Sequence, residues 1–137
     1  MSAKYLLDSW AILAYLKKES PADQRVLELL EKARHGKVLL FLSVINLGEI
    51  YYIVGRARGE DTAQHILEEI KQLPVEILPV DETDVLAAAR WKMQYPMAYA
   101  DAFAASAAQD LQAILLTGDP ELLALENLLE IEILKRN

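Results

Sequence analysis

Four carboxylates stand in stretches of sequence where a charged side chain is expensive to bury. They are Asp8, Glu49, Asp101 and Asp119. Asp101 lies in the alanine-rich stretch 97–108, and the residues one helical turn away from it offer neither a cation nor a hydrogen-bond donor side chain. A buried carboxylate without a partner is strongly destabilising. Asp101 must therefore be neutralised by something outside its own helix, or it must face water.

Short apolar runs alternate with stretches of helical periodicity, which indicates a parallel α/β sheet covered by helices on both faces. We expect strands at 4–7, 38–42, 75–80, 113–116 and 130–134. We expect helices at 9–18, 21–35, 44–58, 60–73, 81–94, 97–108 and 121–125. The helix at 44–58 is apolar nearly all round, so we expect it to be buried. The expected fold is a three-layer α/β/α sandwich with a central parallel sheet of four to five strands, formed by a single domain over residues 1–137.

This order of elements predicts that the four carboxylates lie at one edge of the sheet. Asp8 and Asp119 directly follow the first and fourth strands, Glu49 is two turns into the helix 44–58, and Asp101 is early in the helix before the fourth strand. Ligands of parallel α/β sheets bind beyond the carboxyl ends of the strands. Asp8 taken alone is also explained as a helix N-cap and Asp119 as a turn residue, whereas exposure of Glu49 and Asp101 would waste an apolar helix face.

A cluster of carboxylates needs either protons or a cation. Two like charges 4 Å apart repel by roughly 4 kcal/mol at an effective dielectric constant near 20, and a typical domain is stable by only about 5–15 kcal/mol. The chain has no cysteine, and His35 and His65 lie on its most polar predicted helices, so we do not expect zinc. Clustered carboxylates form a hard oxygen site suited to Mg²⁺ or Mn²⁺.

The composition is that of an ordered intracellular protein. Of the 137 residues 53% are apolar, and neither a signal peptide nor a membrane-spanning stretch is apparent, so we expect a cytoplasmic location. The net charge of −7 by itself argues against nucleic-acid binding, because contacts to phosphates need lysine and arginine.

Four short motifs give the chain a resemblance to a known family. They are Leu6-Leu7-Asp8-Ser9, Ser43-x5-Glu49, Ala100-Asp101-Ala102-x-Ala104-Ala105 and Leu116-Thr117-Gly118-Asp119. In order and spacing they resemble the signature of PIN-domain ribonucleases, in particular the VapC-like toxins of bacterial and archaeal toxin–antitoxin pairs. The resemblance covers the whole chain. One departure is Trp10, which stands where the family usually has a small polar residue.

The resemblance implies a function and a set of site residues. Asp8, Glu49, Asp101 and Asp119 would be the metal-binding and catalytic acids, with the hydroxyls of Ser9 and Thr117 in support. Asp8, Asp101 and Asp119 are expected to bind metal directly, and Glu49 to bind a second ion or orient water. The reaction would be hydrolysis of an RNA phosphodiester by a Mg²⁺- or Mn²⁺-dependent endoribonuclease with one or two ions. The family also suggests a homodimer and a cognate antitoxin protein that inserts a segment near the site.

The acidic composition is compatible with this function. Two divalent ions would change the net charge from −7 to about −3 before RNA binds. Arg56 and Arg58, at the end of the helix that carries Glu49, are candidates for contacts to RNA phosphates. The aromatic residues at 51–52 and 91–95 are candidates for lining an antitoxin groove, with core packing as their alternative role.

Two other functions remain open. A phosphorylatable receiver domain has similar length and a parallel sheet, but it needs paired acids after the first strand and a phosphoacceptor aspartate after the third. The segment Asp81-Glu82-Thr83-Asp84 after the third strand is better explained as a helix cap. A PIN fold used only as a binding module is the second alternative, although such modules often lose acids that this chain keeps.

Overall fold

The protein folds around a parallel sheet of five strands. The computed structural model describes residues 2–137. In chain order the strands are β1 (Ala3–Leu7), β2 (Val38–Ser43), β3 (Glu76–Leu78), β4 (Ile114–Thr117) and β5 (Ile131–Ile133). Their spatial order is β3-β2-β1-β4-β5, and every neighbouring pair is parallel. The chain therefore moves outward from β1 in one direction through β2 and β3, then starts again on the other side with β4. The predicted parallel sheet is confirmed.

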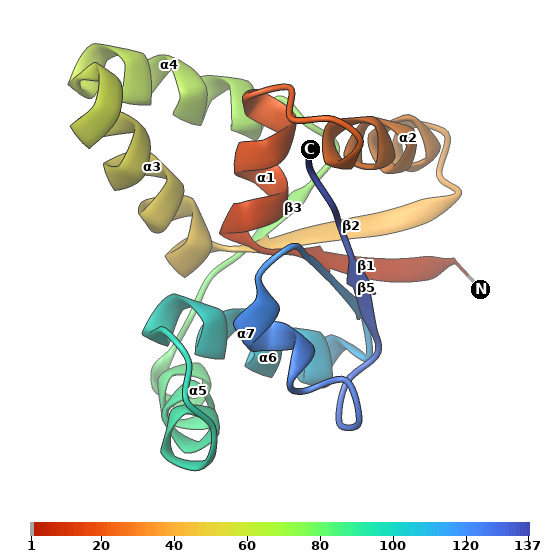
Figure 1. Ribbon diagram of the computed structural model, residues 1–137, viewed down its shortest axis with the longest axis vertical. Helices are drawn as coiled ribbons and strands as arrows, with labels where there is room; N and C mark the ends of the chain where they lie inside the picture. The colour runs from red at the N-terminus through yellow and green to blue at the C-terminus, as the bar shows by residue number, and fades with distance from the viewer. Residues whose placement is uncertain (1) are drawn as a thin grey trace.

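Seven helices connect these strands within the described residues. They are α1 (Ser9–Leu16), α2 (Ala22–Arg34), α3 (Val44–Arg58), α4 (Glu60–Lys71), α5 (Glu82–Gln94), α6 (Tyr99–Leu111) and α7 (Pro120–Leu123). Helices α1 to α4 cover one face of the sheet and α5 to α7 the other (Figure 1). None of the helices in residues 2–137 is long and apolar enough to cross a membrane.

Two hydrophobic cores lie on the two faces of the sheet. Neighbouring residues of a strand point to opposite faces, so Leu7 belongs to the core under α1 to α4, and Leu6 belongs to the core under α5 to α7. The alanines of α6 allow it to pack closely on the sheet, and Ala102, Ala104 and Ala105 have no exposed surface. The three-layer α/β/α sandwich is confirmed.

Local capping explains where several helices begin. Ser43 caps α3 by accepting a hydrogen bond from the Ile45 amide. Asp81 and Asp84 form the predicted capping box of α5. Asp81 follows the edge strand β3 and is exposed, so it does not occupy the central position that a phosphoacceptor of a receiver domain would need.

The prediction that the helix 44–58 is buried is wrong. Only Asn46, Leu47 and Ile50 of α3 are buried, while Val44 is 37% exposed and Tyr52 is 50% exposed. The physical reason is that α3 packs along one side only, against α1, α4 and α6, and nothing in the described chain covers its other side. An apolar surface on a helix does not specify which element of the same chain covers it.

Candidate metal centre

Asp8 is buried at the carboxyl end of the central strand β1. It is 1% exposed, and as the N-cap of α1 it accepts a hydrogen bond from the Ala11 amide at 2.9 Å. The hydroxyl of Thr117 donates a second hydrogen bond to its other carboxylate oxygen. The sheet register explains this contact, because Leu7 pairs with Leu116 and the next residues, Asp8 and Thr117, lie side by side. Asp8 is therefore a helix N-cap, which was the alternative explanation from the sequence, and it is also a buried carboxylic acid at the end of β1.

Asp119 lies beside Asp8 because β4 pairs directly with β1. Its backbone amide donates to the Thr117 hydroxyl oxygen at 3.0 Å, and its carboxylate accepts from the Glu121 amide at 2.9 Å as the N-cap of α7. Asp8 and Asp119 thus flank the point where the strand order reverses between β1 and β4. Such a switch point is the usual ligand site of an open α/β sheet.

Asp101 approaches the same point from the opposite layer of helices. It is the third residue of α6 and is 8% exposed. One carboxylate oxygen each from Asp101, Asp119 and Glu121 lie within 4.8 Å of one another. Within residues 2–137 no ion pair involves any of these three acids. The cation that this arrangement calls for is not supplied by a side chain.

Burial changes the acid strength of two of these groups. Burial, together with the nearby negative charge of Asp119, raises the pKa of Asp101 to about 8. Burial likewise raises the pKa of Asp8 to about 7, against the opposing effect of the hydrogen bonds from Thr117 and Ala11. A carboxylate held this far from water is stabilised by a proton or by a bound cation.

All four predicted acids line one pocket of about 350 Å³. Its lining residues are Asp8, Ser9, Trp10, Leu13, Glu49, Ile53, Ala98, Asp101, Asp119 and Glu121. None of the lysines, arginines and histidines in the described part of the chain is among them. The structure therefore brings together the four carboxylates that the sequence analysis singled out, with Ser9 at the wall of the pocket and Thr117 directly behind Asp8.

Glu121 is a further acid at this site that the sequence analysis missed. It stands two residues after Asp119, in the first turn of α7. The sequence Asp119-Pro120-Glu121 carried a usable signal, because a proline after a helix cap fixes the start of a helix and places the next residue in its first turn.

Asn46 is the second residue that the sequence analysis did not assign to the site. It has no exposed surface, and its side-chain amide donates to the Ser9 hydroxyl at 3.2 Å and to the Ala100 carbonyl at 3.3 Å. The Ser9 hydroxyl in turn donates to the backbone carbonyl of Asn46 at 3.3 Å. Asn46 thus joins α3 to α1 and α6 next to Asp8 and Asp101. The signal was a single amide in an apolar helix, which does not reveal its partners.

Arg56 and Arg58 lie outside the acidic pocket. The guanidinium carbon of Arg56 is 5.5 Å from the centre of the Tyr52 ring. Arg58 lines a separate groove of about 110 Å³ between α1, α3 and α4, which shares Leu13 and Ile53 with the acidic pocket. Their role as RNA contacts stays a prediction. His35 and His65 are exposed and lie outside the acidic pocket.

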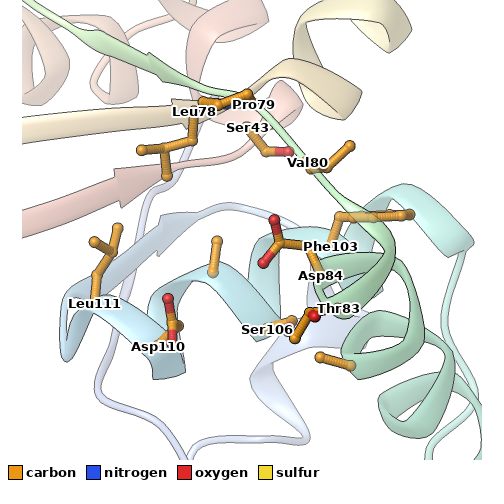
Figure 2. A pocket seen from close by; sticks show the side chains of 12 residues that line it. Ser43, Leu78, Pro79, Val80, Thr83, Asp84, Phe103, Ser106, Asp110 and Leu111 are labelled. Carbon is orange, nitrogen blue, oxygen red and sulfur yellow. The ribbon is translucent and has the colours of Figure 1, made fainter.

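Two other cavities contain none of the four predicted acids. One, of about 190 Å³, lies between α6 and the segment that joins β3 to α5 (Figure 2). Its labelled carboxylates, Asp84 and Asp110, come from α5 and α6, and Asp84 already belongs to the α5 capping box. The other, of about 350 Å³, is lined by Trp91 and Tyr95 together with Arg90. The proposed antitoxin groove at these aromatic residues stays a prediction.

Comparison with known proteins identifies the family of the chain. The PIN domain family model matches residues 5–128. No curated protein matches the sequence.

Solved structures with the same fold include three from toxin–antitoxin systems. VapBC2 from Rickettsia felis, bound to a DNA fragment from its promoter, has a TM-score of 0.73 at 18% identity and covers 96% of this chain and 99% of that chain. VapBC-1 from nontypeable Haemophilus influenzae has a TM-score of 0.67 at 21% identity, with 95% and 97% covered. The sarcin-ricin loop cleaving toxin VapC20 from Mycobacterium tuberculosis has a TM-score of 0.68 at 14% identity, with 88% and 93% covered. With the family match across most of the sequence and this fold, the chain belongs to the PIN-domain family.

Proposed function

We propose that this protein is a metal-dependent endoribonuclease and the toxin of a toxin–antitoxin pair. The observation that carries the proposal is the convergence of Asp8, Glu49, Asp101 and Asp119 on one pocket that no lysine, arginine or histidine of residues 2–137 lines. Membership of the PIN-domain family supports it. The resemblance of the four motifs to VapC-like toxins and the fold shared with VapC20 point to RNA as the substrate.

The residues of the pocket fit a hard divalent cation. They offer only carboxylate and hydroxyl oxygens, which suit Mg²⁺ or Mn²⁺ and not zinc. Asp8, Asp101 and Asp119 would hold the first ion, and Glu49 and Glu121 stand at the same pocket for a second ion or for its water. When bound, the ion supplies Lewis-acid activation of water and neutralises charge at the phosphate.

The protein side chains prepare the site for this chemistry. The Thr117 hydroxyl fixes one oxygen of Asp8, and the Ala11 amide fixes the other, so the carboxylate cannot rotate. Asn46 holds the helices that carry Ser9 and Asp101 at a fixed separation. Ligands that are oriented in this way lose little entropy when the ion binds.

The assembly and location follow from the same family likeness. We infer a homodimer that acts in the cytoplasm on RNA and is neutralised by a cognate antitoxin protein. The fold shared with VapBC complexes supports a protein partner. Expression of the toxin alone should arrest growth, and expression of Asp101→Asn should not. Co-expression of a short neighbouring reading frame that restores growth would identify the antitoxin.

RNA cleavage by the purified protein is the direct test of the activity. Structured RNA should be cleaved with Mg²⁺ or Mn²⁺ and should remain intact in EDTA. Asp8→Asn and Asp101→Asn should each abolish cleavage, while Asp110→Asn, an exposed acid on the same helix as Asp101, should retain it. Cleavage that persists in EDTA, or that survives both pocket substitutions, would show the proposed mechanism to be wrong.

A further inference from the structure

Trp10 packs its ring face against Gly118 at the wall of the acidic pocket. Trp10 is the second residue of α1 and lines the pocket together with Asp8 and Asp119. A Cβ atom built on Gly118 would lie 2.4 Å from each of three ring atoms of Trp10, namely Cε2, Cζ2 and Cη2. A point equally distant from three atoms of a six-membered ring lies on the axis through the ring centre. Gly118 therefore rests on the face of the indole, and any side chain at this position would overlap the ring.

In this protein the indole of Trp10, and not a positive φ, leaves no room for a side chain at position 118. The glycines with positive φ are Gly36 and Gly59, and Gly118 is not among them. No positive φ therefore requires glycine at position 118. The three atoms nearest to its absent Cβ all belong to Trp10. An alanine at position 118 should be tolerated once the indole is removed.

Gly118 is the middle residue of the turn that presents Asp119. On one side Thr117 anchors this turn, because its hydroxyl donates to Asp8 and accepts from the Asp119 amide at 3.0 Å. On the other side the indole of Trp10 supports it. The turn is thus held between a hydrogen-bonded side and a packed side.

The C-terminal segment restricts the position of the indole. The guanidinium carbon of Arg136 lies 5.1 Å from the centre of the Trp10 ring, within the range of a cation–π contact. Arg136 also pairs with Glu19 at 3.2 Å, and the Asn137 amide donates to the Ser20 carbonyl at 3.0 Å. Trp10 is therefore contacted by Gly118 and by an arginine that is itself tied to the α1–α2 connection.

We propose that Trp10 is a positioning residue for Asp119, and that its contact with Gly118 sets the affinity of the acidic pocket for a divalent cation. The inference rests on the proposed function, because it takes the pocket to be a metal site. Groups that orient metal ligands typically change metal affinity by roughly 10–100-fold when they are mutated. Trp10 would act in this way by packing, whereas Thr117 acts by hydrogen bonding.

Mn²⁺ binding to four variants tests the contact without reference to catalysis. Free Mn²⁺ would be measured by electron paramagnetic resonance for Trp10→Ala, Gly118→Ala, the double variant, and Trp91→Ala as the control tryptophan on α5. We expect Trp10→Ala and Gly118→Ala each to bind Mn²⁺ roughly 10–100-fold more weakly than the wild type. In the double variant the two losses should not add, because alanine at 118 no longer meets a ring. Trp91→Ala should bind within about twofold of the wild type.

A cleavage assay at varied Mn²⁺ separates positioning from a general loss of structure. Trp10→Ala should need more Mn²⁺ for half-maximal cleavage, while kcat at saturating Mn²⁺ and the Tm in EDTA stay close to those of Trp91→Ala. Normal Mn²⁺ binding by Trp10→Ala, or fully additive losses in the double variant, would overturn the positioning role and leave the ribonuclease proposal standing. Variants that lose Mn²⁺ affinity as expected, in a protein that cleaves no RNA, would keep the positioning role and overturn the proposed activity. A wild-type protein that binds no Mn²⁺ would overturn both.

Discussion

Raising the pH of the metal-free protein should destabilise it, because burial favours the protonated, neutral form of the Asp8 and Asp101 carboxyl groups in the folded state. The ordinary pKa of aspartate is 3.8, whereas burial raises the pKa of Asp8 to about 7 and that of Asp101 to about 8. Between about pH 4 and pH 8 the folded protein therefore binds more protons at these positions than the unfolded chain. The free energy of unfolding contributed by these groups is fully present below about pH 4 and is lost as the pH rises to about 8.

The size of this effect follows from the pKa of Asp8. Each tenfold change in an ionisation constant corresponds to about 1.4 kcal/mol. The difference between 3.8 and about 7 thus amounts to about 4 kcal/mol for Asp8 alone. Asp101 adds to this, although the two contributions are not independent, because the negative charge of Asp8 contributes to the raised pKa of Asp101. A loss of about 4 kcal/mol is a large share of the roughly 5–15 kcal/mol by which a typical domain is stable.

Urea unfolding in EDTA at a series of pH values measures this loss. The free energy of unfolding of the wild type should fall between about pH 5 and pH 8, and Mg²⁺ or Mn²⁺ at about pH 8 should restore it, because the ion binds the folded state only. Asp101→Asn should be more stable than the wild type at about pH 8 in EDTA, should approach it at about pH 5, and should respond weakly to metal.

The exposed acid of the same helix provides the matched control. Asp110→Asn should follow the wild type at every pH and respond to metal as the wild type does. The free energy of unfolding in EDTA should fall more steeply for the wild type than for Asp101→Asn between about pH 5 and pH 8. If it stays constant or rises relative to that of the variant, the destabilising effect of the buried carboxylates is refuted. The carboxylates would then be solvated or already neutralised without an ion.

Three further substitutions test individual contacts of the site. Thr117→Val removes the hydroxyl that joins Asp8 to the Asp119 amide, so calorimetry should show roughly 10–100-fold weaker Mn²⁺ binding. Asn46→Ala leaves buried groups unpaired, and chemical unfolding should show a loss of about 1–3 kcal/mol, whereas an unchanged midpoint would contradict its bridging role. Glu121→Gln should weaken Mn²⁺ binding relative to Glu126→Gln, an exposed acid beyond α7, and equal affinities would exclude Glu121 from the site.

The sequence was sufficient for the features that depend on near neighbours in the chain. The runs before Asp8 and Asp119 identified two strands and the edge at which they end. The capping residues Ser43 and Asp81 marked the starts of α3 and α5 correctly. Caps and apolar periodicity involve residues within about four positions of one another, so the local sequence contains the information. Asp101 was conspicuous for the same reason, because its alanine-rich neighbours cannot neutralise it.

The sequence did not determine which side chains of distant segments meet. The approach of Glu121 to Asp101, the hydrogen bonds of Asn46 and the packing of Trp10 on Gly118 all join separate elements. The exposure of Tyr52 on α3 could not be predicted for the same reason, because it depends on which other elements of the protein pack against that side of α3.

The sequence by itself was enough to predict the alternating strands and helices and to single out the acids that follow apolar runs. Only the tertiary structure decided that β4 pairs with β1 and so brings Asp119 and Thr117 to Asp8. The physical reason is that strand order and helix packing are set by contacts between residues far apart in the chain, and these contacts leave no periodic pattern in any one segment.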